Sequence, residues 1–148
     1  MKHKAHMYFW IISILLLLEG VLERIVSKDT TLDINVHDMY LVIDHLYVNI
    51  LFALLYFILG VAYWVPYKTN LELQKKYTKV HTVITVMAVP AFYILWACNA
   101  IMYTSNSITD KSYDTFNTGL LIIFSIVLLV QPLYPVNIIL SLIKRKKA

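Results

Sequence analysis

Side chains that can carry protons or bind a metal lie inside strongly apolar stretches of this 148-residue chain. Glu19 and Glu23 are four residues apart in the first stretch, and His45 and Asn49 are four residues apart in the second. This spacing places each pair on one face of a helix. An ionisable group in apolar surroundings is costly unless a partner or a ligand stabilises it. Glu19 and His45, the deeper two, are therefore the leading candidates for a functional site.

Other polar residues near these positions have simpler explanations. Glu23 and Asp44 lie close to the ends of their apolar stretches, where a carboxylate can reach water without any ligand. The third stretch is expected to bring Asn99 and Met102 to the same level. Cys98, beside them, is expected to be a reduced and unreactive packing residue. The candidate site is thus expected to draw on three helices.

Four apolar stretches must position these residues: about 7–26, 40–66, 80–103 and 118–143. Each is long enough to cross the hydrocarbon core of a bilayer as a helix. Hydrophobic residues make up 59% of the chain and charged residues only 15%, which excludes an ordinary soluble domain. A single cysteine excludes an internal disulfide framework and any multi-cysteine metal site. We predict an all-α integral membrane four-helix bundle, with residues 1–148 as one domain.

Basic and acidic residues separate between the two ends of the predicted helices. Ten of the 13 basic residues lie in 2–4, 68–79 and 144–147, whereas eight of the nine acids lie in or near the loops 27–39 and 104–117. Cytoplasmic loops collect Lys and Arg, so both termini are predicted to be cytoplasmic. The first helix follows two lysines, as a signal peptide does. It is predicted to be retained, because no small-x-small cleavage site follows it.

The same charge pattern bears on location and partners. The net charge of +4 comes from cytoplasmic loops and tails, and no basic soluble face with interleaved aromatic residues offers a site for nucleic acid. Because nothing in the sequence marks an organelle import signal, the predicted location is the inner (plasma) membrane, with the lipid bilayer as the first partner. Other membrane subunits or a second copy of the chain are the expected protein partners.

Two prolines interrupt the fourth stretch near its middle. Pro132 and Pro135 stand between Gln131 and Asn137. Because proline lacks a backbone donor and frees a carbonyl, this helix is predicted to be kinked. Polar neighbours can hydrogen-bond the freed backbone groups, so a structural role is favoured for them over an ion site.

The segment 32–45, LDINVHDMYLVIDH, resembles a segment of subunit I of the heme-copper oxidases. In that family the pattern is Leu-Asp-Ile, two residues, then His-Asp-Thr-Tyr-Tyr-Val-Val-Ala-His-Phe-His. Downstream, WVP at 64–66 and KVH at 79–81 are similar to the family's Trp-x-Pro and Lys-Ile-His. The close match covers about 33–81. By extension, the four helices resemble the last four of the family's twelve.

The resemblance implies roles for individual residues. His45 falls on the axial ligand of the high-spin heme, and Asp33 falls on a residue near the heme propionates. His37 and Asp38 fall on a pair that helps to bind magnesium at the contact with subunit II. Glu19 is expected, from its depth alone, to hydrogen-bond the second ring nitrogen of His45. The implied cofactors are one b-type heme and a magnesium ion.

The departures from the family pattern concern the metals. Tyr47 stands where the family has its low-spin heme histidine, and Asp44 stands where it has a small apolar residue. The other low-spin ligand and the copper ligands belong to helices outside the matched portion. We therefore expect no complete oxygen-reducing site in this chain.

Two hypotheses about the function follow from these residues, and a third is possible but is not supported by any sequence motif. The first is a respiratory-chain, electron-transfer component that binds a single heme through His45. The alternative is a non-catalytic accessory or assembly subunit that has lost its redox centre. The third is a small proton or ion carrier that uses Glu19, Asp44 and His45.

Overall fold

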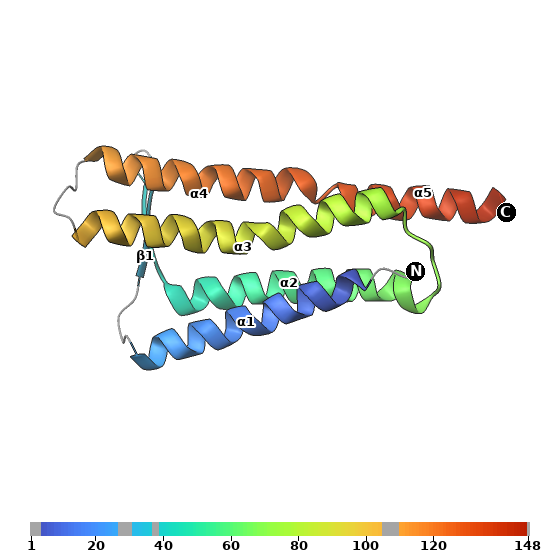
Figure 1. The fold of residues 1–148 in the computed structure, drawn as a ribbon, viewed down its shortest axis with the longest axis horizontal. Coiled ribbons are helices and arrows are strands. Elements are labelled where there is room, and N and C mark those ends of the chain that lie inside the picture. The colour runs from blue at the N-terminus through green and yellow to red at the C-terminus, as the bar shows by residue number, and fades with distance from the viewer. Residues whose placement is uncertain (1–3, 27–30, 37–38, 105–109, 148) are drawn as a thin grey trace. The chain divides into compact units, whose positions relative to one another are not determined.

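The computed structural model describes residues 4–26, 31–36, 39–104 and 110–147, and the chain is mostly helical (Figure 1). The elements in chain order are α1 (Ala5–Val26), β1 (Thr31–Val36), β2 (Met39–Asp44), α2 (His45–Lys68), α3 (Lys75–Thr104), α4 (Asp110–Val130) and α5 (Leu133–Lys147). Contacts divide the chain into two compact units, Met1–Leu73 and Gln74–Ala148. The predicted helical class is confirmed, and the two strands are an addition to it.

In the first unit, α1 and α2 pack side by side along most of their length (Figure 1). Small residues at the contact allow the two backbones to approach closely. The Ser13 hydroxyl donates to the Ala53 carbonyl at 2.7 Å, and Gly60 lies directly under the Trp10 ring. Phe9 is fully buried and stacks on Tyr63 at 5.4 Å between ring centroids. These contacts pack α1 tightly against α2.

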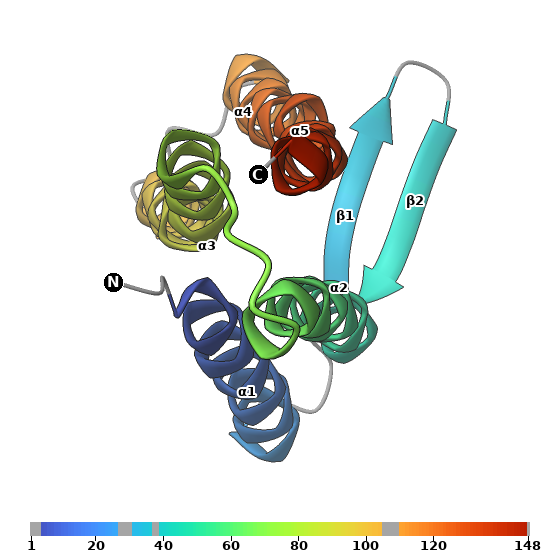
Figure 2. The same ribbon diagram turned by 90° about the vertical axis from the view of Figure 1, so that its right-hand side faces the viewer.

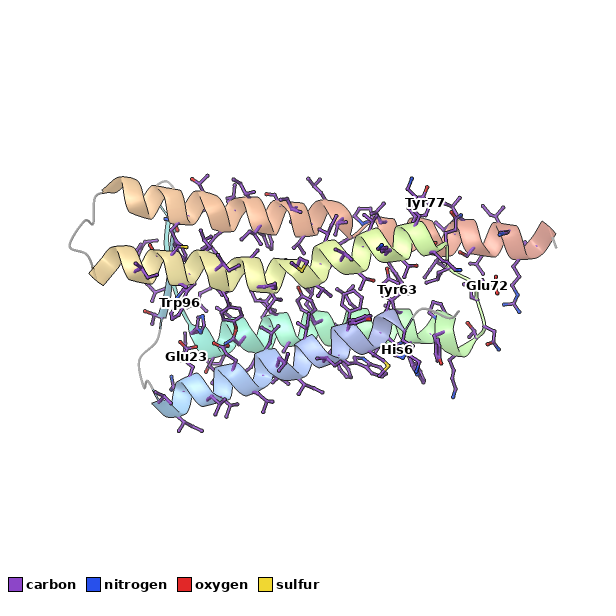
Figure 3. The ribbon with its side chains drawn as sticks, viewed as in Figure 1. His6, Glu23, Tyr63, Glu72, Tyr77 and Trp96 are labelled. Atoms are coloured by element: carbon purple, nitrogen blue, oxygen red, sulfur yellow. The ribbon has the colours of Figure 1, made fainter. Side chains whose placement is uncertain are left out.

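The two ends of α1 differ in character. Near its start, the centroid of the His6 ring lies 5.3 Å from that of the Trp10 ring and 4.8 Å from that of the Tyr67 ring. Near its other end, Glu23 approaches the beginning of α2 (Figure 3). One end of the α1–α2 pair is therefore aromatic, and the other is polar and ionisable.

A β-hairpin precedes α2 where the apolar pattern predicts the first residues of a helix. β1 and β2 pair antiparallel from Thr31 opposite Asp44 to Val36 opposite Met39 (Figure 2). The Asp44 carboxylate accepts from the Leu46 backbone N–H at 2.9 Å, which caps the helix and makes His45 its first residue. The predicted start at 40 is thus wrong by five residues, because residues 40–44 extend the hairpin.

In the second unit, α3 packs against α4 and α5. The fourth apolar stretch is interrupted at Gln131 and Pro132, as the prolines predict. The Gln131 side chain donates to the Val127 carbonyl at 3.0 Å and so satisfies a backbone group near the break. The side-chain oxygen of Gln131, Oε1, contacts His81 Nε2 at 3.2 Å. The polar residue beside the proline therefore has the structural role expected of it.

Many large apolar side chains of these helices are exposed. Within the described residues, three helical stretches are long and apolar enough to cross a membrane: His45–Lys68, Lys75–Asn99 and Phe116–Lys146. The last of these runs through α4 and α5. α1, with 22 residues, is not among the three. Four spanning helices, and the cytoplasmic position of both termini, stay predictions.

Candidate functional site

Four polar side chains meet at the α2 start of the first unit and form what we call the carboxylate–imidazole cluster: Glu19, Glu23, His45 and Asn49. Glu19 and Glu23 lie one turn apart on α1, and His45 and Asn49 lie one turn apart on α2. His45 is 4% exposed and Asn49 is 2% exposed, whereas the two glutamates are half-buried. The imidazole is therefore held in place by the packing of the helix pair.

The cluster consists of two parallel cross-helix contacts. His45 Nδ1 is hydrogen-bonded to the Glu23 carboxylate, and Asn49 Nδ2 donates to the Glu19 carboxylate. Gly20 makes this approach feasible, since a Cβ at that position would lie 2.9 Å from Asn49 Cβ. Each carboxylate of α1 thus meets one polar side chain of α2.

An ion pair closes the cluster at its rim. Arg24 Nη1 lies 2.6 Å from Asp44 Oδ2, the other oxygen of the carboxylate that caps α2. The Arg24 side chain is 51% exposed, so this pair contributes at most about 1 kcal/mol. Its main effect is geometric, because it ties the last turn of α1 to the first turn of α2.

The structure differs from the sequence-based expectation in the partner of His45. Glu19 was the expected partner, yet His45 contacts Glu23, one turn further along α1, and Glu19 contacts Asn49. Depth alone does not distinguish two acids one turn apart on the same face. The matching four-residue spacing of the two pairs is the signal in the sequence that could have indicated this register.

The remaining predicted site residues lie elsewhere or outside the described part of the chain. Asp33 is in β1, opposite Val42 in the hairpin. His37 and Asp38, predicted to bind magnesium, lie outside the described residues. Tyr47, at the position of the second family histidine, is 66% exposed. Cys98 was expected to be a packing residue but is exposed on α3.

The cluster has the composition and size of a metal site. One ligating atom from each of Glu19, Glu23 and His45 lies within 4.8 Å of the other two. A neutral imidazole and two carboxylates are the ligands that divalent transition metals take in proteins. In the structure Glu23 is hydrogen-bonded to His45, and Glu19 accepts from Asn49. The arrangement therefore fits two roles, a closed structural network or a centre that binds a cation or a heme iron.

Comparisons with known protein families, with curated proteins and with solved structures give no match to this chain. The oxidase resemblance of residues 33–81 therefore stays a prediction from sequence motifs.

Proposed function

We propose that this protein is a non-catalytic membrane subunit of an oxidase-like respiratory assembly. The observation that carries the proposal is the cross-helix network around His45. The residue at the family's heme-ligand position contacts a carboxylate of the neighbouring helix, and Asn49, one turn on, contacts another. These two contacts within the chain account for His45 Nδ1 and the Asn49 amide nitrogen without a redox centre.

The hairpin supports a role within a larger assembly. The side chains of Met39, Tyr40, Leu41 and Val42 are between 51% and 72% exposed, so β2 presents apolar groups on both of its faces. A two-stranded hairpin with such a surface is only marginally stable in water. A neighbouring subunit that covers β2 would bury this apolar surface.

A second candidate function is that of a heme-binding electron carrier, with His45 as the axial ligand. The contact between His45 Nδ1 and Glu23 favours it, because axial histidines commonly donate the other ring N–H to a carboxylate or a carbonyl. Glu23, rather than Glu19, would then orient the ring. In this function one b-type heme would supply one-electron redox chemistry.

Absorbance spectra separate the two functions. The tagged chain is purified from its native membranes in a mild detergent and then stripped of partners in a harsher one. For an accessory subunit, heme absorbance co-purifies in the mild detergent and is lost from the isolated chain.

Two variants, His45→Ala and His81→Ala, identify the ligand if the isolated chain is coloured. A Soret band that survives in His81→Ala and disappears in His45→Ala would overturn the accessory function in favour of the heme carrier. If no heme protein co-purifies and the chain is colourless, the proposed assembly is wrong.

We also propose that α1 crosses the membrane with the other helices, so that both termini are cytoplasmic. In a Cys98→Ala background, needed because Cys98 is exposed, single cysteines are introduced at Lys4, Thr69 and Ser107. With an impermeant maleimide on intact cells, we expect labelling at 107 only, because the acidic residues Asp110 and Asp114 near it predict an outside position.

Two other labelling patterns contradict parts of this topology. Labelling at both 4 and 107 would mean that α1 does not cross the membrane. Labelling at 69 without 107 would reverse the orientation and remove the agreement with the oxidase helices. Permeabilised cells, in which all three cysteines should react, provide the control for reactivity.

A further inference from the structure

We propose that Glu19, Glu23 and His45 form a binding site for a divalent transition-metal cation of the Zn²⁺ class, between the end of α1 and the first turn of α2. This goes beyond the accessory function, which requires no ligand. Two of the side chains come from one helix and the third from its neighbour, so a bound ion would link α1 to α2.

The geometry provides the ligand atoms at nearly the required spacing. Zn²⁺ binds nitrogen and oxygen ligands at about 2.0–2.2 Å, which places neighbouring ligand atoms roughly 3–3.5 Å apart. The three candidate atoms lie within 4.8 Å of one another, so small rotations of the two glutamates bring them to an ion. His45 is 4% exposed and already directs Nδ1 at Glu23. The cation would take the Nδ1 lone pair, and the single proton of the neutral ring would then be on Nε2.

The charges of the cluster also favour a cation. Glu19 contacts a neutral amide, and Glu23 contacts an imidazole. With a neutral imidazole, the two carboxylates leave two negative charges in half-buried positions. Arg24, the basic residue at this end of α1, is paired with Asp44. Half-buried charge is costly unless an opposite charge lies nearby. A divalent cation, which brings the total charge of the two carboxylates and the ion to zero, is therefore stabilised there.

The ligand types indicate the class of metal. One imidazole nitrogen and two carboxylate oxygens suit Zn²⁺ and its first-row neighbours, whereas Mg²⁺ and Ca²⁺ prefer ligand sets made entirely of oxygen. Asn49 would act on the metal through Glu19, by holding that carboxylate in orientation. Three protein ligands leave a fourth tetrahedral position for water or for a ligand from another molecule.

Cation and heme compete for the same ring. A neutral imidazole has one lone pair, so a cation on Nδ1 excludes iron on Nε2. The cation site can therefore be present or absent whether or not the protein is an accessory subunit. A bound cation at this site is incompatible with the heme-carrier function.

The test uses the purified full-length chain in detergent, treated with a chelator and then titrated with Zn²⁺ in competition with a chromophoric chelator. We expect one Zn²⁺ per chain. Glu19→Gln and Glu23→Gln should each raise the Zn²⁺ dissociation constant by at least about tenfold, a loss of the size seen when groups that support a metal site are removed. Glu72→Gln, which alters an exposed carboxylate outside the cluster, is the matched control and should bind as the unaltered chain does.

A second measurement keeps the proposal testable if a variant folds poorly. Zn²⁺ should raise the thermal unfolding midpoint of the unaltered chain, because a ligand that binds only the folded state stabilises it, and Mg²⁺ at the same concentration should not. Substoichiometric binding, an equal loss in Glu72→Gln, an equal shift with Mg²⁺, or a Soret band that depends on His45 would each overturn the site.

Discussion

Gly60→Leu is expected to separate α1 from α2 and to destabilise the first unit more than any other single substitution proposed for it. A Cβ at residue 60 would lie 2.2 Å from Trp10 Cδ1 and 2.3 Å from Trp10 Nε1, well inside van der Waals contact. The indole ring cannot yield by a small rotation about one bond, so the helices must part or the ring must leave its site. Overpacking of this kind costs about 1–3 kcal/mol, and we expect the upper end here.

The measurement is the free energy of unfolding in detergent, and unfolding is monitored through the near-ultraviolet circular dichroism of the aromatic residues. Val61→Leu, which enlarges the adjacent exposed side chain, is the control and should change stability by less than about 0.5 kcal/mol. The double variant Gly60→Leu with Trp10→Ala should recover part of the loss, because the smaller side chain leaves room for the leucine. If the two substitutions are simply additive, the contact between residues 10 and 60 does not limit the packing.

The helices could be predicted from the sequence because long apolar stretches leave few alternatives. The boundaries were less certain, as the start of α2 illustrates. Residues 40–43 are a continuous apolar run, which suits either the first turn of a helix or a buried strand. Asp44 carried the information that separates the two, because aspartate is a preferred N-cap and marks His45 as the first helical residue. Pro132 was the clearer signal: α4 ends at Val130, and α5 begins at Leu133 with Pro135 in its first turn.

Of the cluster's residues, the sequence favours Glu19 and His45 for a site and leaves Glu23 to solvent, and it does not predict the pairing. Periodicity placed Glu19 and Glu23 on one face and His45 and Asn49 on another, and the structure brings these faces together. Which glutamate meets His45 depends on how far α1 slides along α2. That distance is set by remote contacts, such as the one between Gly60 and Trp10. The local signal for it is the matching four-residue spacing of the two pairs, which depth alone does not use. The oxidase resemblance could not supply the pairing, because its matched portion begins after α1.

Asn137→Leu is expected to produce the largest loss of stability in the second unit. The Asn137 side chain is fully buried on α5, and its Oδ1 accepts from the Gln74 backbone N–H at 2.9 Å. Its Nδ2 donates to the Gln74 carbonyl at 3.3 Å and to the Thr78 hydroxyl at 3.0 Å. Gln74 directly precedes α3, so an amide from α5 holds the N-terminus of that helix. From the sequence, Asn137 was expected to serve the proline kink instead, because its contacts with Gln74 and Thr78 are long-range in the chain.

Three hydrogen bonds at about 1 kcal/mol each predict a loss of roughly 2–4 kcal/mol for Asn137→Leu. A faster amide hydrogen exchange at Gln74 and in the first turn of α3 should accompany it. Ser141→Ala removes a hydroxyl equally buried on the same helix, for which the described residues offer no hydrogen-bond partner, and it should be neutral or slightly stabilising. If Asn137→Leu were no worse than Ser141→Ala, the buried amide would not be what fixes the start of α3.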